Sequence, residues 1–330
     1  MILQHLWAIY HPTIPDFIKS MAETPAMQRL KDIGMNCGCE YTSFPLFLGL
    51  NKYSRFNHSV GVGLIVWHFT HDVQQAVAAL LHDISTPVFA HVIDFMNNDH
   101  ERQESTESRT TEFITSSEEL QACLLHVGLT TADVDDYHRF PIADNDTPRL
   151  SADRLEYTMG NIVNYHIGSR EDVVRYYDDL VVDVNEDGVD ELMFCHSDTA
   201  LAFGMATLQT SAIYVDDQDR YAMQMLALLV KKHINRLVLT VDDLYTGESQ
   251  VIQKLMDDEE ARTDWLRYRA LHTMSPIGNP LSEPIAINAK KRYIDPFVKG
   301  EGRLSSISET YRQHLAIFLS QSFDHKIFGE

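Results

Sequence analysis

The spacing of apolar residues along the chain predicts a mainly helical protein. Apolar side chains between Val62 and Phe69 recur every three or four positions, so they fall on one face of a helix that begins near His58. The segment from Val73 to His82 is still richer in apolar residues, and we expect this second helix at the centre of the fold. The same spacing predicts further helices over residues 107–114, 118–126, 152–162, 199–213 and 220–230.

One stretch has the pattern of strands instead. Residues 180–194 alternate between apolar and polar side chains around Glu186-Asp187-Gly188, which is typical of a β-hairpin. The stretch also resembles the start of a calcium-binding loop. Its twelfth position is Phe194, where such a loop needs a glutamate, so a tight turn is favoured.

These patterns together predict an all-α fold with a small β-hairpin insertion and a C-terminal helical elaboration. We expect the main helical domain over residues 1–245, with the hairpin at about 180–194 inside it. Residues 246–330 are expected to form an elaboration that packs on the same domain.

Composition narrows the classes of partner. Of the 330 residues, 44% are hydrophobic, which supports a well-buried core, and the formal net charge is −21. Such a surface repels nucleic-acid polymers and anionic membranes, whereas a pocket with its own metal ion and basic groups can still bind a small phosphorylated substrate. No apolar run approaches the ~20 residues of a membrane span. Four cysteines are few for a chain of this length, and the N-terminal residues lack the pattern of a signal peptide. We therefore expect a cytoplasmic protein.

Four residues spread along the chain are candidate metal ligands: His58, His82, Asp83 and Asp153. Hydrolysis of a phosphoester needs an activated water and neutralisation of the charge on the phosphate oxygens. A divalent ion held by imidazole and carboxylate supplies both. Neighbours on a helix diverge by about 100°, so His82 and Asp83 converge only at a helix end. Pro87 follows closely and disfavours helix before it, so we expect the helix to end just after Asp83.

Each of these residues also has a structural interpretation. His82 follows four apolar residues and could be a hydrogen-bonded core histidine, and Asp83 could cap the helix end. His58 could be an ordinary residue at a helix N-terminus, and Asp153 could be the N-cap of the helix that follows it. Single residues do not decide between the two interpretations.

Four short motifs favour the metal site when they are taken in order. They are Arg55-Phe56-Asn57-His58-Ser59-Val60-Gly61-Val62, Leu81-His82-Asp83-Ile84, Phe89-Ala90-His91 with Asp94 shortly after, and Asp153-Arg154-Leu155-Glu156-Tyr157. In this order they resemble the HD-domain phosphohydrolases, and more closely the branch related to deoxynucleoside triphosphate triphosphohydrolases. The resemblance runs from about Thr24 to Tyr157 and implies a helical HD-domain core.

The resemblance implies that His58, His82, Asp83 and Asp153 are the metal ligands. Mixed imidazole and carboxylate ligation suits Fe, Mn, Ni, Zn, Co or Mg, so the residues do not identify the metal. Four ligands suffice for one ion, which is the expected number. A second ion would need further side chains and stays open.

The resemblance also assigns residues to the substrate. Arg55 is expected to reach a substrate phosphate, where its guanidinium group suits paired oxygens. His91 and Asp94 are expected to form an acid–base pair, and Arg154 and Tyr157 match positions that touch phosphate and sugar.

The chain departs from this branch at Ser85-Thr86, where the relatives have a glycine and a second histidine. That histidine is a further cation or proton donor near the phosphates, so its loss weakens the case for triphosphate cleavage and leaves the metal site intact. We expect a metal-dependent phosphohydrolase of a nucleotide or similar small molecule, a deoxynucleoside triphosphate being the first substrate to consider. The alternatives are a nucleoside monophosphatase, a cyclic-nucleotide phosphodiesterase, or a regulatory HD module that binds ligand with little turnover. The sequence leaves homo-oligomerisation open.

Overall fold

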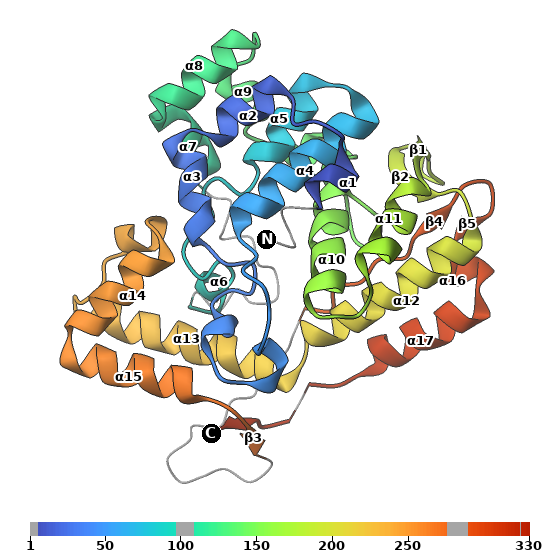
Figure 1. Ribbon diagram of the computed structural model, residues 1–330. Coiled ribbons are helices and arrows are strands. Elements are labelled where there is room, and N and C mark those ends of the chain that lie inside the picture. Colours follow the sequence, from blue (N-terminus) through green and yellow to red (C-terminus); the bar gives the residue numbers. More distant parts are fainter. Residues whose placement is uncertain (1–5, 97–108, 276–289, 324) are drawn as a thin grey trace.

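A computed structural model describes residues 6–96, 109–275, 290–323 and 325–330 of the chain. Helices make up most of it (Figure 1). Helices α4, α5 and α10 lie together in the upper part of the view, α12 and α13 run beneath them, and the C-terminal helices flank the lower part on both sides. The predicted helical fold with a small β insertion is confirmed.

The α-helices are α1 (Trp7–Tyr10), α2 (Asp16–Ala22), α3 (Pro25–Arg29), α4 (Arg55–Thr70), α5 (Val73–Leu81), α6 (Val92–Met96), α7 (Thr110–Ser116), α8 (Glu118–His126), α9 (Thr131–Val134), α10 (Ala152–Asn164), α11 (Arg170–Asp178), α12 (Ser197–Ile213), α13 (Asp217–Asn235), α14 (Glu248–Asp257), α15 (Glu259–Ala270), α16 (Leu304–Ile307) and α17 (Glu309–Ser320). Short 3₁₀ turns are η2 (Leu30–Asp32), η3 (Cys39–Tyr41), η4 (Pro45–Phe47), η5 (Tyr137–Arg139) and η6 (Asp242–Tyr245). The strands are β1 (Leu180–Val184), β2 (Asp190–Phe194), β3 (Met274–Ser275), β4 (Phe297–Val298), β5 (Gly302–Arg303) and β6 (Phe328–Gly329).

Two of the three helices that carry candidate ligands begin at serine caps, and α5 is capped by Asp72. Ser54 accepts a hydrogen bond from the backbone N–H of Asn57 at the start of α4, and Ser151 accepts one from the N–H of Arg154 at the start of α10. Asp153 is therefore not the N-cap of its helix. Its carboxylate is free of that structural task.

Helix α5 ends at Leu81, slightly earlier than predicted. His82 is the C-cap residue, and Asp83 lies in a turn closed by a 2.9 Å hydrogen bond from the N–H of Thr86 to the Asp83 carbonyl. As predicted, the helix ends before Pro87. Because His82 and Asp83 stand at the helix end, their side chains can approach the same point.

The predicted hairpin forms between β1 and β2, which pair antiparallel from Leu180 opposite Phe194 to Val184 opposite Asp190. Its turn is tight as expected, because the Asn185 side-chain oxygen accepts hydrogen bonds from the N–H groups of Asp187 and Val189. The sheet is larger than a hairpin, since the order is β1-β2-β4-β5. Residues after 290 therefore return to this part of the fold.

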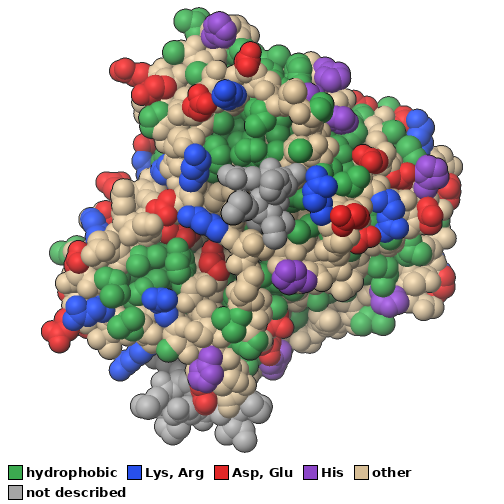
Figure 2. All heavy atoms as spheres, viewed as in Figure 1, with side chains coloured by type: hydrophobic (Ala, Val, Ile, Leu, Met, Phe, Trp, Pro, Cys, Tyr) green, Lys and Arg blue, Asp and Glu red, His purple; other side chains and the backbone are tan. Residues whose placement is uncertain are grey.

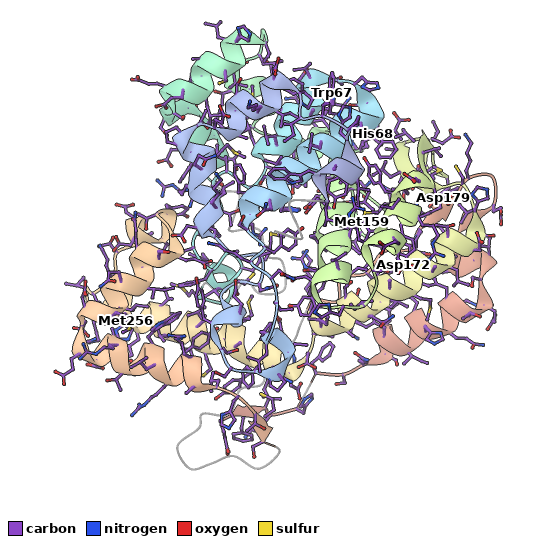
Figure 3. All side chains as sticks on the ribbon, viewed as in Figure 1. Trp67, His68, Met159, Asp172, Asp179 and Met256 are labelled. Atoms are coloured by element: carbon purple, nitrogen blue, oxygen red, sulfur yellow. The ribbon has the colours of Figure 1, made fainter. Side chains whose placement is uncertain are left out.

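Two buried apolar clusters lie in the described part of the chain. The first surrounds α4, α5, α10 and α12 and contains Met159, and α16 and α17 pack on its α12 side. The second joins α13 to α14 and α15, and Met256 packs against it. Figure 3 labels both methionines, Met159 on α10 near the middle of the view and Met256 on α14 at the left. The division at residue 245 stays a prediction.

No helix in the described ranges is both long and apolar enough to cross a membrane. On the face shown in Figure 2, acidic and basic side chains are interspersed among uncharged ones.

A glycine on α4 and one on α10 each leave room for a buried side chain of a neighbouring segment. A Cβ atom at Gly61 would lie 2.7 Å from the Glu156 side chain, and one at Gly160 would overlap the ring of Tyr53. Neither position has room for a methyl group, so both helices are held close by the absence of side chains.

We expect Gly160→Ala to lower the free energy of unfolding by about 1–2 kcal/mol. Because the added Cβ would overlap the buried Tyr53 ring, overpacking is expected to cost about 2–3 kcal/mol, and the gain in helix propensity offsets about 1 kcal/mol of it. Urea denaturation measures the change, with Arg267→Ala on the exposed face of α15 as the control. A Gly160→Ala protein as stable as the wild type would contradict the tight packing of α10 against Tyr53.

Candidate metal centre

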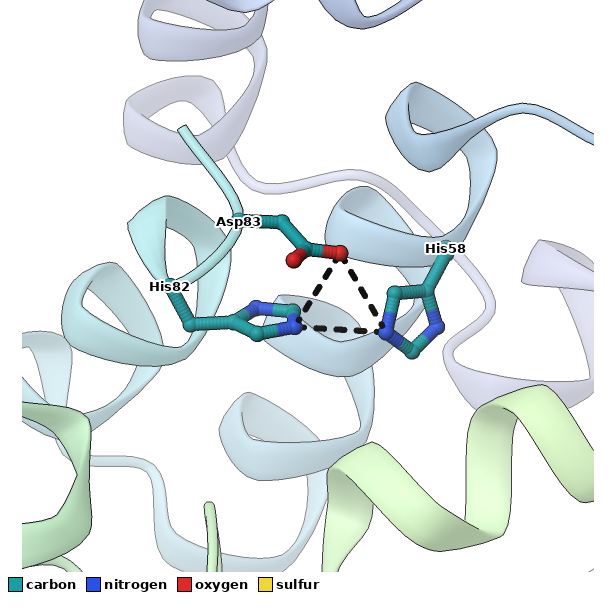
Figure 4. A group of neighbouring side chains, drawn as sticks. All are labelled: His58, His82 and Asp83. Atoms are coloured by element: carbon teal, nitrogen blue, oxygen red, sulfur yellow. Dashed lines mark hydrogen bonds and ion pairs between the residues drawn. The ribbon is translucent and has the colours of Figure 1, made fainter. Parts of the chain in front are cut away.

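The structure brings the four predicted ligands together. His58 comes from the first turn of α4, His82 and Asp83 from the end of α5, and Asp153 from the first turn of α10. Figure 4 shows His58, His82 and Asp83 pointing toward one another. All of these groups are buried except Asp153, whose side chain is 20% exposed.

The facing atoms of His58, His82 and Asp83 lie at separations that fit one bound ion, and Asp153 approaches the two imidazoles. The Nε2 atoms of His58 and His82 are 3.2 Å apart, and the Oδ1 atom of Asp153 lies 2.9 and 3.7 Å from them. The Oδ2 atom of Asp83 lies 3.8 Å from His58 Nε2 and 3.5 Å from His82 Nε2. Ligands held about 2.1 Å from an ion at right angles are about 3.0 Å apart, and tetrahedral ligands are slightly further apart.

The outer ring nitrogens fix which atoms face the centre. His58 Nδ1 lies 2.6 Å from a Glu156 oxygen, and His82 Nδ1 lies 2.7 Å from the carbonyl oxygen of Ala79. Both partners are acceptors, so each Nδ1 carries the proton and each Nε2 is left to face the other Nε2 and the two carboxylates. Metal-binding histidines are oriented in this way. The residues present therefore fit a divalent cation.

Asp83 is held as a carboxylate from two sides. Its Oδ2 atom accepts a 2.9 Å hydrogen bond from Arg55 Nη1, and its Oδ1 atom accepts one of 2.7 Å from the Thr86 hydroxyl. Burial alone would raise the pKa of Asp83, but Arg55 and the nearby imidazoles hold that pKa well below its usual range. Thr86, which stands in place of the second histidine of the relatives, thus serves the metal ligand.

The cluster attracts positive charge. Burial would lower the pKa of His58, but hydrogen bonds to Asp153 and Glu156 outweigh burial and raise that pKa to about 10. Against the effect of burial, His58 also holds the pKa of Asp153 below its usual range. Binding of a metal would displace the proton from His58 Nε2, which is the exchange expected where an imidazole is a ligand.

Sequence reasoning missed Glu156 as a member of the centre. Its side chain is 2% exposed and accepts hydrogen bonds from His58 and from the hydroxyl groups of Tyr53 and Tyr10. Glu156 follows Asp153 by three residues, so both carboxylates lie near one face of α10. That spacing was the signal that could have identified it.

A cavity of about 590 Å³ opens beside the cluster. Its lining includes the four ligands, Arg55, His91, Arg154 and Tyr157, so it reaches all the predicted site residues whose side chains are described. The side chain of Asp94, which lies on α6, is outside the described residues. The volume falls within the range of about 300–1,000 Å³ that is typical of small-molecule sites.

Arg154 is already engaged by the protein. It donates hydrogen bonds to the carbonyl oxygen of Arg149, to Asn145 and to Asp144, and so it holds the loop ahead of α10. Tyr157 lies one turn after Asp153, with its ring 6.4 Å from that of His58. Contacts of either residue with a substrate stay predictions.

Comparison with known proteins gives two relatives in sequence. The chain is 24% identical over 290 residues to the uncharacterized protein YdhJ of Bacillus subtilis, covering 86% of this chain and 85% of that protein. It is 30% identical over 141 residues to the metal-dependent phosphohydrolase cns2 of Cordyceps militaris, covering 41% of this chain and 39% of that protein. No family model matches the chain.

Solved structures share the fold. A phosphohydrolase from Bacteroides thetaiotaomicron superposes with a TM-score of 0.59 at 15% identity and covers 94% of both chains. A hypothetical protein from Aquifex aeolicus superposes with a TM-score of 0.56 at 14% identity, over 96% of this chain and 92% of that one. These likenesses support the helical fold, and the relative from Cordyceps militaris supports the resemblance to metal-dependent phosphohydrolases. The narrower resemblance to triphosphohydrolases stays a prediction.

We expect Glu156→Gln to weaken metal binding by 10- to 100-fold, because loss of a carboxylate behind a ligating histidine lowers the basicity and order of that histidine. Titration of chelator-treated protein with Mn²⁺ in a calorimeter measures the affinity. Glu171→Gln, at an exposed position on α11, is the matched control. Equal Mn²⁺ affinity in both variants would contradict the supporting role of Glu156.

Proposed function

We propose that the protein is a metal-dependent phosphohydrolase of a small phosphorylated molecule, with a nucleotide monoester as the favoured substrate. The observation that carries the proposal is the convergence of two imidazole Nε2 atoms and two carboxylates at one wall of a cavity. The relative from Cordyceps militaris, which is named a metal-dependent phosphohydrolase, supports the same reaction class.

His58, His82, Asp83 and Asp153 would hold the metal ion. When bound, a divalent ion supplies an activated water and neutralises charge on phosphate oxygens. Arg55 adds a fixed positive charge beside this point, because its guanidinium group pairs with Asp83 and lines the cavity. Its pairing also keeps Asp83 ionised, which is the form that binds a metal.

His91 is the proposed residue for proton transfer. It lines the same cavity as the ligands and comes directly after Phe89 and Ala90, whose φ angles of 59° and 43° turn the chain sharply. Non-glycine residues rarely adopt positive φ, so the surrounding structure determines this turn. An imidazole placed there can give a proton to the leaving oxygen or take one from water.

Thr86 favours a monoester over a triphosphate. The side chain that replaces the second histidine of the relatives is 1% exposed, and its hydroxyl group is used by Asp83. This position therefore supplies no cation for additional phosphates. A deoxynucleoside triphosphate stays the second substrate to test.

An assay of both inorganic phosphate and nucleoside or nucleotide products, run with Mn²⁺ over nucleoside monophosphates, triphosphates and cyclic monophosphates, tests the proposal. We expect release from monophosphates, and we expect His82→Ala to abolish it together with metal binding. His126→Ala, which removes an exposed histidine from α8, should match the wild type. Protein that binds Mn²⁺ and forms no hydrolysis product from any member of the panel would instead be a regulatory binding module.

His91→Ala separates proton transfer from metal binding. We expect this variant to keep the Mn²⁺ affinity of the wild type and to lose about 10²- to 10⁴-fold in kcat, the usual contribution of a general acid or base. Steady-state kinetics and calorimetry measure the two quantities. An unchanged kcat would rule out His91 as the proton-transfer residue.

A further inference from the structure

A carboxyl group that has no partner among the described residues lines the cavity from another element. Asp219 lies in the first turn of α13 and lines the same cavity as the metal cluster. Helix α13 packs on α6 and α15, whereas α4 packs on α5 and α10, so Asp219 and the cluster belong to different walls (Figure 1). No described residue forms a hydrogen bond or ion pair with the Asp219 carboxyl group.

The other partly buried or buried acids of the cavity all have partners. Asp83 pairs with Arg55, Asp153 with His58, and Asp144 with Arg154. Even the adjacent Arg220 is turned to other groups, since its guanidinium binds Asp217 and His325. A half-buried carboxyl group left over in a binding cavity is available to a ligand.

Asp219 is suited to a neutral part of the ligand. Burial raises the pKa of Asp219 to about 8, and the nearby Asp216 raises it further than Arg220 lowers it. At pH 7 the group is therefore mainly uncharged, so it does not repel a phosphorylated molecule. A neutral carboxyl group offers one donor and one acceptor side by side.

The lining of the cavity near Asp219 includes polar groups that carry no charge. The hydroxyl group of Tyr165 donates a 3.2 Å hydrogen bond to the Asn36 side chain, and both residues line the cavity with Cys37. Burial raises the pKa of Cys37 to about 12, so its thiol is neutral too. A hydroxyl or amino group of a ligand would find hydrogen-bond partners at this wall.

We infer that Asp219 is a specificity-determining residue that binds a hydroxyl or amino group in the organic part of the phosphate monoester. The inference rests on the proposed function, because it assigns the phosphate to the metal cluster and the remainder of the substrate to the wall formed by α13. The substrate class is thus a monoester whose alcohol part carries hydrogen-bond donors, as a nucleoside does.

Two substrates with different alcohol parts test this. The first is the nucleoside monophosphate that the wild type hydrolyses best, and the second is p-nitrophenyl phosphate, whose alcohol part has no donor. For the nucleotide, we expect Asp219→Leu to raise KM about 10-fold with kcat nearly unchanged, since loss of one hydrogen bond affects binding before chemistry. Asp219→Asn keeps an acceptor and a donor and should stay within about threefold of the wild type.

For p-nitrophenyl phosphate, both variants should stay within about twofold of the wild type in KM and kcat, the range we allow for indirect effects without a lost hydrogen bond. Asp178→Leu and Asp178→Asn make the same changes at an exposed site on α11 and should alter neither substrate. Asp219→Ala, which is smaller, replaces Asp219→Leu if thermal denaturation shows that the leucine variant does not fold.

The outcomes separate this inference from the proposed function. Wild-type protein that releases phosphate from neither substrate contradicts the proposed function. Hydrolysis with equal KM changes for both substrates, or with no change in either, overturns only the role of Asp219. If the protein hydrolyses p-nitrophenyl phosphate but no nucleotide, the role of Asp219 is overturned as well.

Discussion

The structure depends on negative charge that is buried around one point. Asp83, Asp153 and Glu156 lie within or directly behind the cluster, and the Arg55 guanidinium pairs with Asp83. With both imidazoles neutral, as they must be to bind a metal, these three carboxylates and this guanidinium carry a net charge of −2. Buried charge without compensation is costly, so the site needs a cation. A divalent ion restores neutrality and uses the two Nε2 atoms that face each other.

That constraint explains the packing of α4 against α10. Glu156 on α10 can reach His58 on α4 only because Gly61 leaves room for its side chain. The same carboxylate binds the hydroxyl group of Tyr53, whose ring fills the space left by Gly160. Core packing and ligand orientation are therefore one arrangement, and the cavity beside it inherits a fixed wall. The cavity residues of α13 belong to an element that packs in the other apolar cluster.

The local sequence pattern was sufficient to predict the elements whose bounds depend on neighbouring residues. The helix over 118–126 and the hairpin over 180–194 have the predicted bounds, since caps, periodicity and turn residues are all present in the sequence. The convergence of His58, His82, Asp83 and Asp153 came from the resemblance, because spacing alone left a structural interpretation for each. Glu156 and Asp219 escaped prediction for a physical reason: their significance lies in which partners they meet or lack after folding. The hydroxyl group of Thr86 likewise supports Asp83 in a way that its position in the sequence does not reveal.

The most direct test is anomalous X-ray diffraction from crystals of the protein equilibrated with Mn²⁺. The account predicts one strong peak at about 2.0–2.3 Å from the Nε2 atoms of His58 and His82 and from a carboxylate oxygen of Asp83 and of Asp153. If crystals equilibrated with saturating Mn²⁺ showed no peak between these four side chains, or showed Mn²⁺ only elsewhere, the proposed metal centre would be contradicted.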